Sequence, residues 1–155
     1  MRNYYSYTVK IGEILIVEDD GNIVEIALGT KRKYLGTEHE TPEIKKAIQQ
    51  LREYFDGKRK TFDFRIKAQG TEFQQKVWNA LQSIAYGEVC SYKQIAEKIG
   101  NPKAARAVGM ANNKNPLPIV VPCHRIVGSN GKLVGYACGL DIKAELLNIE
   151  KNAKE

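Results

Sequence analysis

The hydrophobic pattern of this chain changes once, near residue 70, and this change limits the possible folds more than any other feature. Residues 4–29 are rich in Tyr, Ile, Val and Thr, as strands are, and the cluster Asp20-Gly21-Asn22 predicts a turn between two of them. After residue 70 the apolar residues recur mainly at helical spacing. The chain therefore predicts an α+β protein with a β-rich first part and a mostly helical second part.

A helix and a further strand complete the predicted first part. Thr41 is a suitable N-cap and Pro42 a suitable first helical residue for a helix that Gly57 ends. The segment "TFDFRI", residues 61–66, predicts a short strand. We expect one small α+β lobe over residues 1–67.

Two capping boxes mark helix starts in the second part, which we place at residues 70–152. Thr71 is followed by Gln74, and Ser91 is followed by Gln94, so a helix should begin after each hydroxyl residue. The turn Gly100-Asn101-Pro102 then separates two short helices. This is the pattern of a helix-turn-helix, winged-helix-like DNA-binding motif, although any two packed helices produce a similar one.

The second helix of this pair, "KAARAVGMANNK", has unusually small side chains. Arg106 alone extends from a surface of alanine and glycine residues. Such a helix can approach DNA closely, or it can pack tightly on another helix.

The segment "PIVVPCHRIVG", Pro118 to Gly128, leads an apolar run into a thiol and an imidazole. The run Ile119-Val120-Val121 predicts a buried strand, and Cys123 and His124 follow it. A nearby imidazole increases the thiolate fraction of a cysteine and makes it a usable nucleophile. Neighbours on a strand point to opposite faces, so the pair can cooperate only where the backbone turns or a water bridges them. Glu150 is a candidate to orient the imidazole.

Other interpretations of this segment stay open on the residues alone. Cys123 can be a packed core thiol, or the nucleophile of a cysteine hydrolase. A structural zinc site needs about four ligands at close spacing. The chain has three cysteines and two histidines, and His39 lies far from His124, so we expect no metal.

The end of the chain predicts a loop and a helix. Asn130-Gly131 is a turn signal inside residues 126–140, and Asp141 is the expected cap of a last helix over residues 142–152.

Charge and cysteine content narrow the class of protein. The formal net charge of +6 suits a polyanionic partner such as nucleic acid. An odd number of cysteines without dense spacing argues against a disulfide framework and favours a reducing compartment. We find no signal peptide and no apolar run of membrane-spanning length, so we expect a cytoplasmic protein without membrane contact.

The motifs "SYKQIA", "NPKAARAVG", "VVPCHRIVG" and "GYACGL" resemble, in order and spacing, those of the O6-alkylguanine-DNA alkyltransferases, also called methylated-DNA–protein-cysteine methyltransferases. The resemblance covers Gly70 to Glu150, while the first lobe is only compatible with the family. It implies irreversible, single-turnover transfer of the alkyl group of O6-alkylguanine, and also of O4-alkylthymine, to the protein's own cysteine. It implies no cofactor, a monomer, and double-stranded DNA as partner, bound through its minor groove with the damaged base flipped out.

The resemblance also implies a role for each matching residue. Cys123 matches the nucleophile, His124 the base that acts through a water, and Glu150 the carboxylate that orients it. Asn115 matches the residue that holds the turn before the active site, and Tyr92 the hydrogen-bond donor to the leaving guanine. Arg106 matches the side chain that enters the duplex. Further expected DNA contacts are Ala104, Ala105, Gly109, Lys93, Asn101 and Ser129. The expected walls of the base pocket are Tyr136, Pro118, Val121, Ala137 and Cys138.

One position departs from the family pattern. Cys138 stands where a glycine or another small residue is expected, which suggests a narrower pocket that disfavours bulky adducts, or a second thiol that pairs with Cys123 on oxidation. The main alternative to a transferase is a non-catalytic damaged-base sensor of the same fold. The presence of both Cys123 and His124 argues against it.

Overall fold

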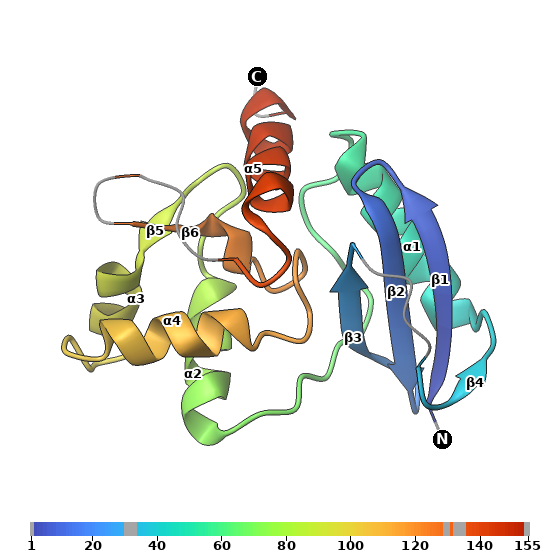
Figure 1. Ribbon diagram of the computed structural model, residues 1–155, viewed down its shortest axis with the longest axis horizontal. Helices are drawn as coiled ribbons and strands as arrows, with labels where there is room; N and C mark the ends of the chain where they lie inside the picture. Colours follow the sequence, from blue (N-terminus) through green and yellow to red (C-terminus); the bar gives the residue numbers. More distant parts are fainter. Residues whose placement is uncertain (1, 30–33, 129–130, 132–135, 154–155) are drawn as a thin grey trace.

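The protein, as a computed structural model, is described over residues 2–29, 34–128, 131 and 136–153. Figure 1 shows a sheet-containing N-terminal lobe and a helical C-terminal part, with helix α5 (Leu140–Ala153) standing between them. The α+β fold class predicted from the sequence is confirmed. Among the described residues, no helix is long and apolar enough to cross a membrane.

The N-terminal lobe is built on a four-stranded sheet. Its strands are β1 (Asn3–Val9), β2 (Gly12–Asp19), β3 (Asn22–Leu28) and β4 (Thr37–Glu38), in the order β3-β2-β1-β4. Neighbouring strands are antiparallel except for β1 and β4. The predicted turn at Asp20-Gly21 is confirmed, and both residues have positive φ, 52° and 82°, as a two-residue hairpin turn of type I′ requires.

Helix α1 (Pro42–Phe55) packs its apolar stripe against this sheet. Thr41 caps the helix by accepting a hydrogen bond from the Ile44 backbone amide at 3.2 Å, as predicted. Gly57 follows the helix with φ 74°, a left-handed conformation that glycine adopts without a steric cost. The sequence thus sets both ends of α1, and the sheet fixes its buried face.

The strand predicted over residues 61–66 does not form. The segment makes only one parallel bridge, between Ile66 and Ile23 of β3. In this parallel register the residues before Ile66 lie opposite the turn at Asp20-Gly21 and not opposite β3, so they have no strand to pair with. Farther along the edge of β3, the Ile26 amide donates to the carbonyl of Pro116 in the C-terminal part at 2.8 Å.

The C-terminal part begins with α2 (Glu72–Leu81) and continues through β5 (Cys90–Ser91), α3 (Tyr92–Lys98) and α4 (Ala105–Asn113). A 3₁₀ turn η1 (Cys123–Arg125), strand β6 (Ile126–Val127) and α5 complete it, with β5 and β6 parallel. Both predicted capping boxes are present, at Thr71 with Gln74 and at Ser91 with Gln94. The two helices of the predicted helix-turn-helix, α3 and α4, pack against each other.

Two other predictions for this part are wrong. The expected strand at residues 119–121 is a tight turn closed by the bridge between Pro118 and Val121, and Ile119 has φ 77°. The last helix begins at Leu140, so Asp141 lies inside its first turn, where a negative charge favours the helix dipole, and does not cap it. The expected turn at Asn130-Gly131 falls largely outside the described residues.

Candidate active site

Cys123 and His124 lie on the 3₁₀ turn η1, and both side chains are buried. The turn is closed by hydrogen bonds from the Cys123 amide to Val121 O at 2.7 Å and from the Arg125 amide to Pro122 O at 3.0 Å. Successive side chains of a 3₁₀ turn project about 120° apart, whereas those of a strand oppose each other. The turn therefore supplies the backbone change that cooperation between the two residues requires.

The imidazole of His124 is held by Glu150 of α5. The two side chains meet at 2.6 Å between Nε2 and Oε2, and both are almost fully buried. Burial lowers the pKa of His124 although Glu150 raises it, so the ring is neutral at physiological pH. An ionised carboxylate only accepts hydrogen bonds, so Nε2 carries the proton. Nδ1 is buried without a hydrogen-bond partner among the described residues, and its lone pair is free to accept a proton.

The carboxylate of Glu150 is also bound by three groups that the sequence did not indicate. Arg125 donates from Nε to Oε1 at 2.9 Å and from Nη2 to Oε2 at 3.0 Å. The amide of Gly87 donates to Oε1 at 3.1 Å, and the hydroxyl of Tyr54 to Oε2 at 2.6 Å. Burial by itself would raise the pKa of Glu150, but the hydrogen bonds of His124, Arg125 and Tyr54 hold it at about 2. The carboxylate is therefore ionised throughout the physiological range.

The thiol of Cys123 lies in a dry environment. Burial raises its pKa to about 11, against the lowering effect of the Asn115 and Tyr136 side chains. The buried Tyr136 hydroxyl lies close to this thiol, and each group affects the pKa of the other. Asn115 itself donates to Val121 O at 2.8 Å and accepts from the Leu117 amide at 2.9 Å. It thereby holds the turn before Cys123, in the place the sequence predicted.

Lys143 is a buried cation beside this thiol, and no sequence signal identified it. Its side chain is fully buried on α5, with the ammonium 5.9 Å from the centre of the Tyr136 ring. Burial lowers its pKa and the charge of Cys123 raises it. The thiol thus has an asparagine amide and a lysine ammonium in its surroundings, a setting that favours the thiolate once a base removes the proton.

The predicted walls of the base pocket differ in their exposure to solvent. Pro118 and Val121 are buried beneath the active-site turn, while Cys138 is half-buried and Ala137 is exposed. Burial is the main cause of the raised pKa of Cys123, and the Cys138 thiol adds to it. Among the described residues, no three His, Cys, Asp or Glu side chains gather into a group that could hold a metal ion.

This chain matches two models of one family. Residues 72–152 match the 6-O-methylguanine DNA methyltransferase, DNA binding domain, and residues 3–68 match the 6-O-methylguanine DNA methyltransferase, ribonuclease-like domain. The chain belongs to the 6-O-methylguanine DNA methyltransferase family. It is 50% identical over 158 residues to the constitutive methylated-DNA–protein-cysteine methyltransferase of Bacillus subtilis (strain 168), covering 96% of each chain.

Solved structures of the family have the same fold. A Mycobacterium tuberculosis O6-methylguanine methyltransferase is 39% identical, with a TM-score of 0.91 over 99% of this chain and 94% of that chain. The M. tuberculosis OGT in complex with DNA is 40% identical, with a TM-score of 0.90 over 97% of this chain and 94% of that chain.

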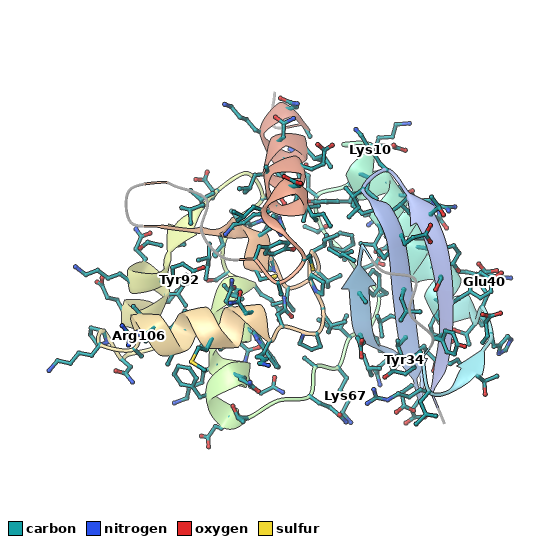
Figure 2. The ribbon with its side chains drawn as sticks, viewed as in Figure 1. Lys10, Tyr34, Glu40, Lys67, Tyr92 and Arg106 are labelled. Atoms are coloured by element: carbon teal, nitrogen blue, oxygen red, sulfur yellow. The ribbon has the colours of Figure 1, made fainter. Side chains whose placement is uncertain are left out.

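In this member of the methyltransferase family, one side of helix α4 is exposed to the solvent. Figure 2 shows Arg106 near the end of α4 that is remote from the N-terminal lobe. Arg106, Ala107 and Met110 are exposed, and Met110, which the sequence analysis did not single out, exposes 66% of its surface. Gly109 has a different role, because a Cβ there would lie 3.4 Å from Cε1 of Tyr92. Gly109 therefore faces the Tyr92 ring, and an alanine there would make an ordinary van der Waals contact with it.

The remaining predicted DNA contacts are spread around this helix. Ala104 and Ala105 at its start are half-buried, and Lys93 and Asn101 are exposed. Ser129 lies outside the described residues. Tyr92 is half-buried, and burial together with the charge of Cys123 raises its pKa, which places Tyr92 between α4 and the thiol.

Proposed function

We propose that this chain is a methylated-DNA–protein-cysteine methyltransferase that repairs O6-methylguanine by taking the methyl group onto Sγ of Cys123. The observation that carries the proposal is the buried thiol beside a neutral, Glu150-bound His124 with a free Nδ1 lone pair, in a chain of this family. Larger O6-alkyl groups and O4-alkylthymine are further proposed substrates. We assign DNA binding and transfer to residues 70–152 and support of the site to residues 1–67.

The proposed reaction is a displacement at the methyl carbon. The Cys123 proton passes to Nδ1 of His124, through a water where the two do not meet directly, and Glu150 stabilises the resulting imidazolium. The thiolate attacks the methyl carbon while the carbon–oxygen bond breaks and its electrons pass to guanine O6. Tyr92 donates a hydrogen bond to the departing base, and the proton released by the thiol returns to guanine. A thioether does not expel its sulfur, so each molecule reacts once.

The proposed DNA complex follows from where the methyl group lies. An alkyl group on a stacked base is reached only when the nucleotide flips out of the duplex. The small side chains Ala104, Ala105 and Ala107 allow the start of α4 to enter the narrow minor groove, and Arg106 fills the space that the flipped base leaves. Tyr136, Pro118, Val121, Ala137 and Cys138 would surround the flipped base. A monomeric state and a cytoplasmic location stay predictions.

The decisive experiment is intact-protein mass spectrometry after mixing with a short duplex that carries one O6-methylguanine. We expect one added methyl that maps to Cys123 and saturates at one per molecule, and no addition in Cys123→Ala, which should still bind the duplex. Cys90→Ala is the matched control and should be methylated like the wild type. Tight binding without a mass change would make the protein a damaged-base sensor, and transfer by Cys123→Ala would place the nucleophile elsewhere.

A further inference from the structure

Tyr54 brings the N-terminal lobe into direct contact with the candidate catalytic pair. It lies on α1, 96 positions before Glu150 in the chain, yet its hydroxyl donates to Glu150 Oε2 at 2.6 Å. The side chain is fully buried, and its ring packs against Phe62 at 5.7 Å and edge-on against Tyr86 at 6.1 Å between ring centres. The hydroxyl is therefore held at the carboxylate by a rigid aromatic cluster.

The protons around Oε2 can be assigned from these contacts. Burial and the charge of Glu150 raise the pKa of Tyr54, so its hydroxyl keeps its proton. The hydroxyl also lies 3.4 Å from Nε2 of His124. Its proton points to the carboxylate, and Nε2–H points to the same oxygen at 2.6 Å. Nη2 of Arg125 donates to Oε2 as well, at 3.0 Å. With three donors on this oxygen, the hydroxyl limits the side from which the imidazole approaches, and the Nδ1 lone pair is directed away from Glu150.

We propose that Tyr54 is a positioning residue through which the N-terminal lobe sets the orientation and basicity of His124. By donating to Oε2, the hydroxyl withdraws electron density from the carboxylate, so Glu150 stabilises the imidazolium less strongly. His124 thus stays neutral and able to accept the thiol proton. The inference rests on the proposed function for its effect on methyl transfer, while its effect on the imidazole can be measured in the resting protein.

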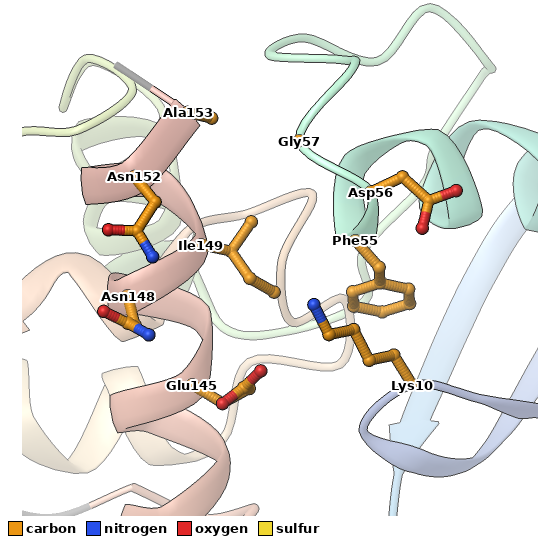
Figure 3. A pocket seen from close by; sticks show the side chains of 9 residues that line it. All are labelled: Lys10, Phe55, Asp56, Gly57, Glu145, Asn148, Ile149, Asn152 and Ala153. Atoms are coloured by element: carbon orange, nitrogen blue, oxygen red, sulfur yellow. The ribbon is translucent and has the colours of Figure 1, made fainter. Parts of the chain in front are cut away.

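Tyr54 joins α1 to α5 by a hydrogen bond beside a gap between the two helices. Beside it, a cavity of about 280 Å³ separates the two helices, lined by Phe55 and Asp56 on one side and Glu145 and Ile149 on the other. Figure 3 shows the Lys10 side chain reaching into this space between Phe55 and α5. The helices are thus separated here and joined at the neighbouring Tyr54–Glu150 hydrogen bond.

The pKa of the His124 imidazole depends on the charged and titratable groups around it. They are Glu150 and Lys143 of α5, Arg125 and Cys123 of η1, Tyr54 of α1, and Tyr86 beyond Glu150. Arg125 and Lys143 lower the pKa of His124, and Glu150 raises it. Removal of the Tyr54 hydroxyl leaves the cations in place and makes the carboxylate a stronger base. The pKa of His124 should therefore rise in Tyr54→Phe.

The test compares Tyr54→Phe with Tyr86→Phe. Tyr86 belongs to the same aromatic cluster, and its buried hydroxyl makes no hydrogen bond with a described residue, so its removal is a matched control. The first readout is the pH titration of the His124 ring nitrogens by NMR, without DNA. The second is the single-turnover rate of methyl transfer as a function of pH, with thermal unfolding of each variant measured in parallel.

We expect Tyr54→Phe to raise the pKa of His124, to shift the acid limb of the rate profile to higher pH, and to lower the rate near neutral pH about tenfold. Tyr86→Phe should match the wild type in both readouts. An unchanged His124 titration in a folded Tyr54→Phe variant would overturn the proposal, as would a rate loss without a shift of the acid limb, since that is the result of a merely structural role. A wild-type protein that transfers no methyl group would refute the proposed function, while the NMR titration would still decide the role of Tyr54.

Discussion

Arg125 and Glu150 form a two-point ion pair in the interior of the protein, with Nε 2.9 Å from Oε1 and Nη2 3.0 Å from Oε2. The guanidinium also donates from Nη1 to the carbonyl of Ile84 at 2.7 Å. Arg125 thus connects the active-site turn to α5 and to the segment that follows α2. Breaking a buried pair by removing one partner costs about 3–5 kcal/mol, because the other charge is left uncompensated.

The buried Arg125–Glu150 pair predicts that the free energy of unfolding decreases strongly at low pH. The pKa of Glu150 falls from 4.5 to about 2 on folding, so the carboxylate stabilises the fold above pH 4.5, and this stability is lost as the pH falls towards 2. The loss should be about 3 kcal/mol. His124, whose pKa burial lowers from 6.5, adds a further loss below that pH because the unfolded ring binds a proton more readily.

Urea unfolding between pH 7 and pH 2.5 measures this dependence in wild type, Glu150→Gln and Glu145→Gln. Glu150→Gln should be less stable than the wild type at pH 7 and should show a flatter profile below pH 4.5. Glu145, a half-buried carboxylate of the same helix, is the control and should leave the profile unchanged. Parallel profiles for Glu150→Gln and the wild type would contradict the assignment of the acid sensitivity to Glu150.

The raised pKa of Cys123 predicts its reactivity in the resting protein. Because the thiolate is the reactive form, the rate of Cys123 alkylation by iodoacetamide should rise about tenfold per pH unit towards its pKa of about 11. Peptide mapping follows each cysteine separately, and the same protein in urea supplies the reference for an ordinary thiol. A plateau of the Cys123 rate near pH 8 would show that the resting thiol is already ionised.

Features of this fold that depend on local sequence were predictable. The hairpin at Asp20-Gly21, the N-cap at Thr41 and the capping boxes at Thr71 and Ser91 each involve residues within a few positions of one another. The donors and acceptors of these turns and caps are neighbours in the sequence, so the local pattern is sufficient to place them.

The wrong predictions concern segments whose strand composition is not matched by a pairing partner. Residues 61–66 have strand composition, but the parallel bridge between Ile66 and Ile23 leaves the residues before Ile66 opposite a turn. The apolar residues 119–121 form a turn because Asn115 bonds both Val121 and Leu117. Neither arrangement can be inferred from composition or periodicity.

The site was predictable only as far as its motifs extend. The resemblance indicated Cys123, His124 and Glu150, and the structure brings His124 and Glu150 together across 26 positions. Tyr54 and Lys143 gave no signal, because a tyrosine near an apolar stripe and a lysine on an amphipathic helix are ordinary. Their partners are set by the packing of α1 and α5, which the sequence alone does not describe.

The exposed side chain of Met110 predicts that its face of α4 contacts DNA. It exposes 66% of its surface and lies one turn after Arg106. A negative charge there should be repelled by the phosphates, so Met110→Glu should weaken duplex binding about tenfold. Fluorescence anisotropy at one fixed salt concentration measures the effect. Leu35→Glu, at a 96% exposed position of the N-terminal lobe, makes the same change in net charge, and equal losses in both variants would mean that α4 has no special part in binding.

The position of Cys138 predicts that the protein prefers to transfer small alkyl groups. Its half-buried thiol lies where the sequence predicts the mouth of the base pocket, and Cys138→Gly would widen that mouth. We expect the ratio of the transfer rate from O6-benzylguanine to that from O6-methylguanine to rise several-fold in this variant. Cys90→Ala controls for the general effect of thiol removal. Equal rate ratios in wild type and Cys138→Gly would show that Cys138 does not limit adduct size.

Variants of Asn115 show whether its side chain supports the turn before Cys123, the Cys123 thiolate, or both. Asn115→Asp keeps the shape of the side chain and the acceptor for the Leu117 amide, but it loses the donor to Val121 O and places a negative charge beside Cys123. The pKa of the thiol should rise further, and the rate of methyl transfer should fall at least tenfold. Asn115→Ala removes both hydrogen bonds and should reduce the free energy of unfolding by about 1–3 kcal/mol. Asn148→Asp, at an exposed position of α5 and outside α4, adds the same charge and should leave the transfer rate unchanged. If Asn115→Asp keeps the wild-type rate and the wild-type alkylation profile of Cys123, the amide supports only the turn, and the thiolate must be stabilised by other groups such as Lys143.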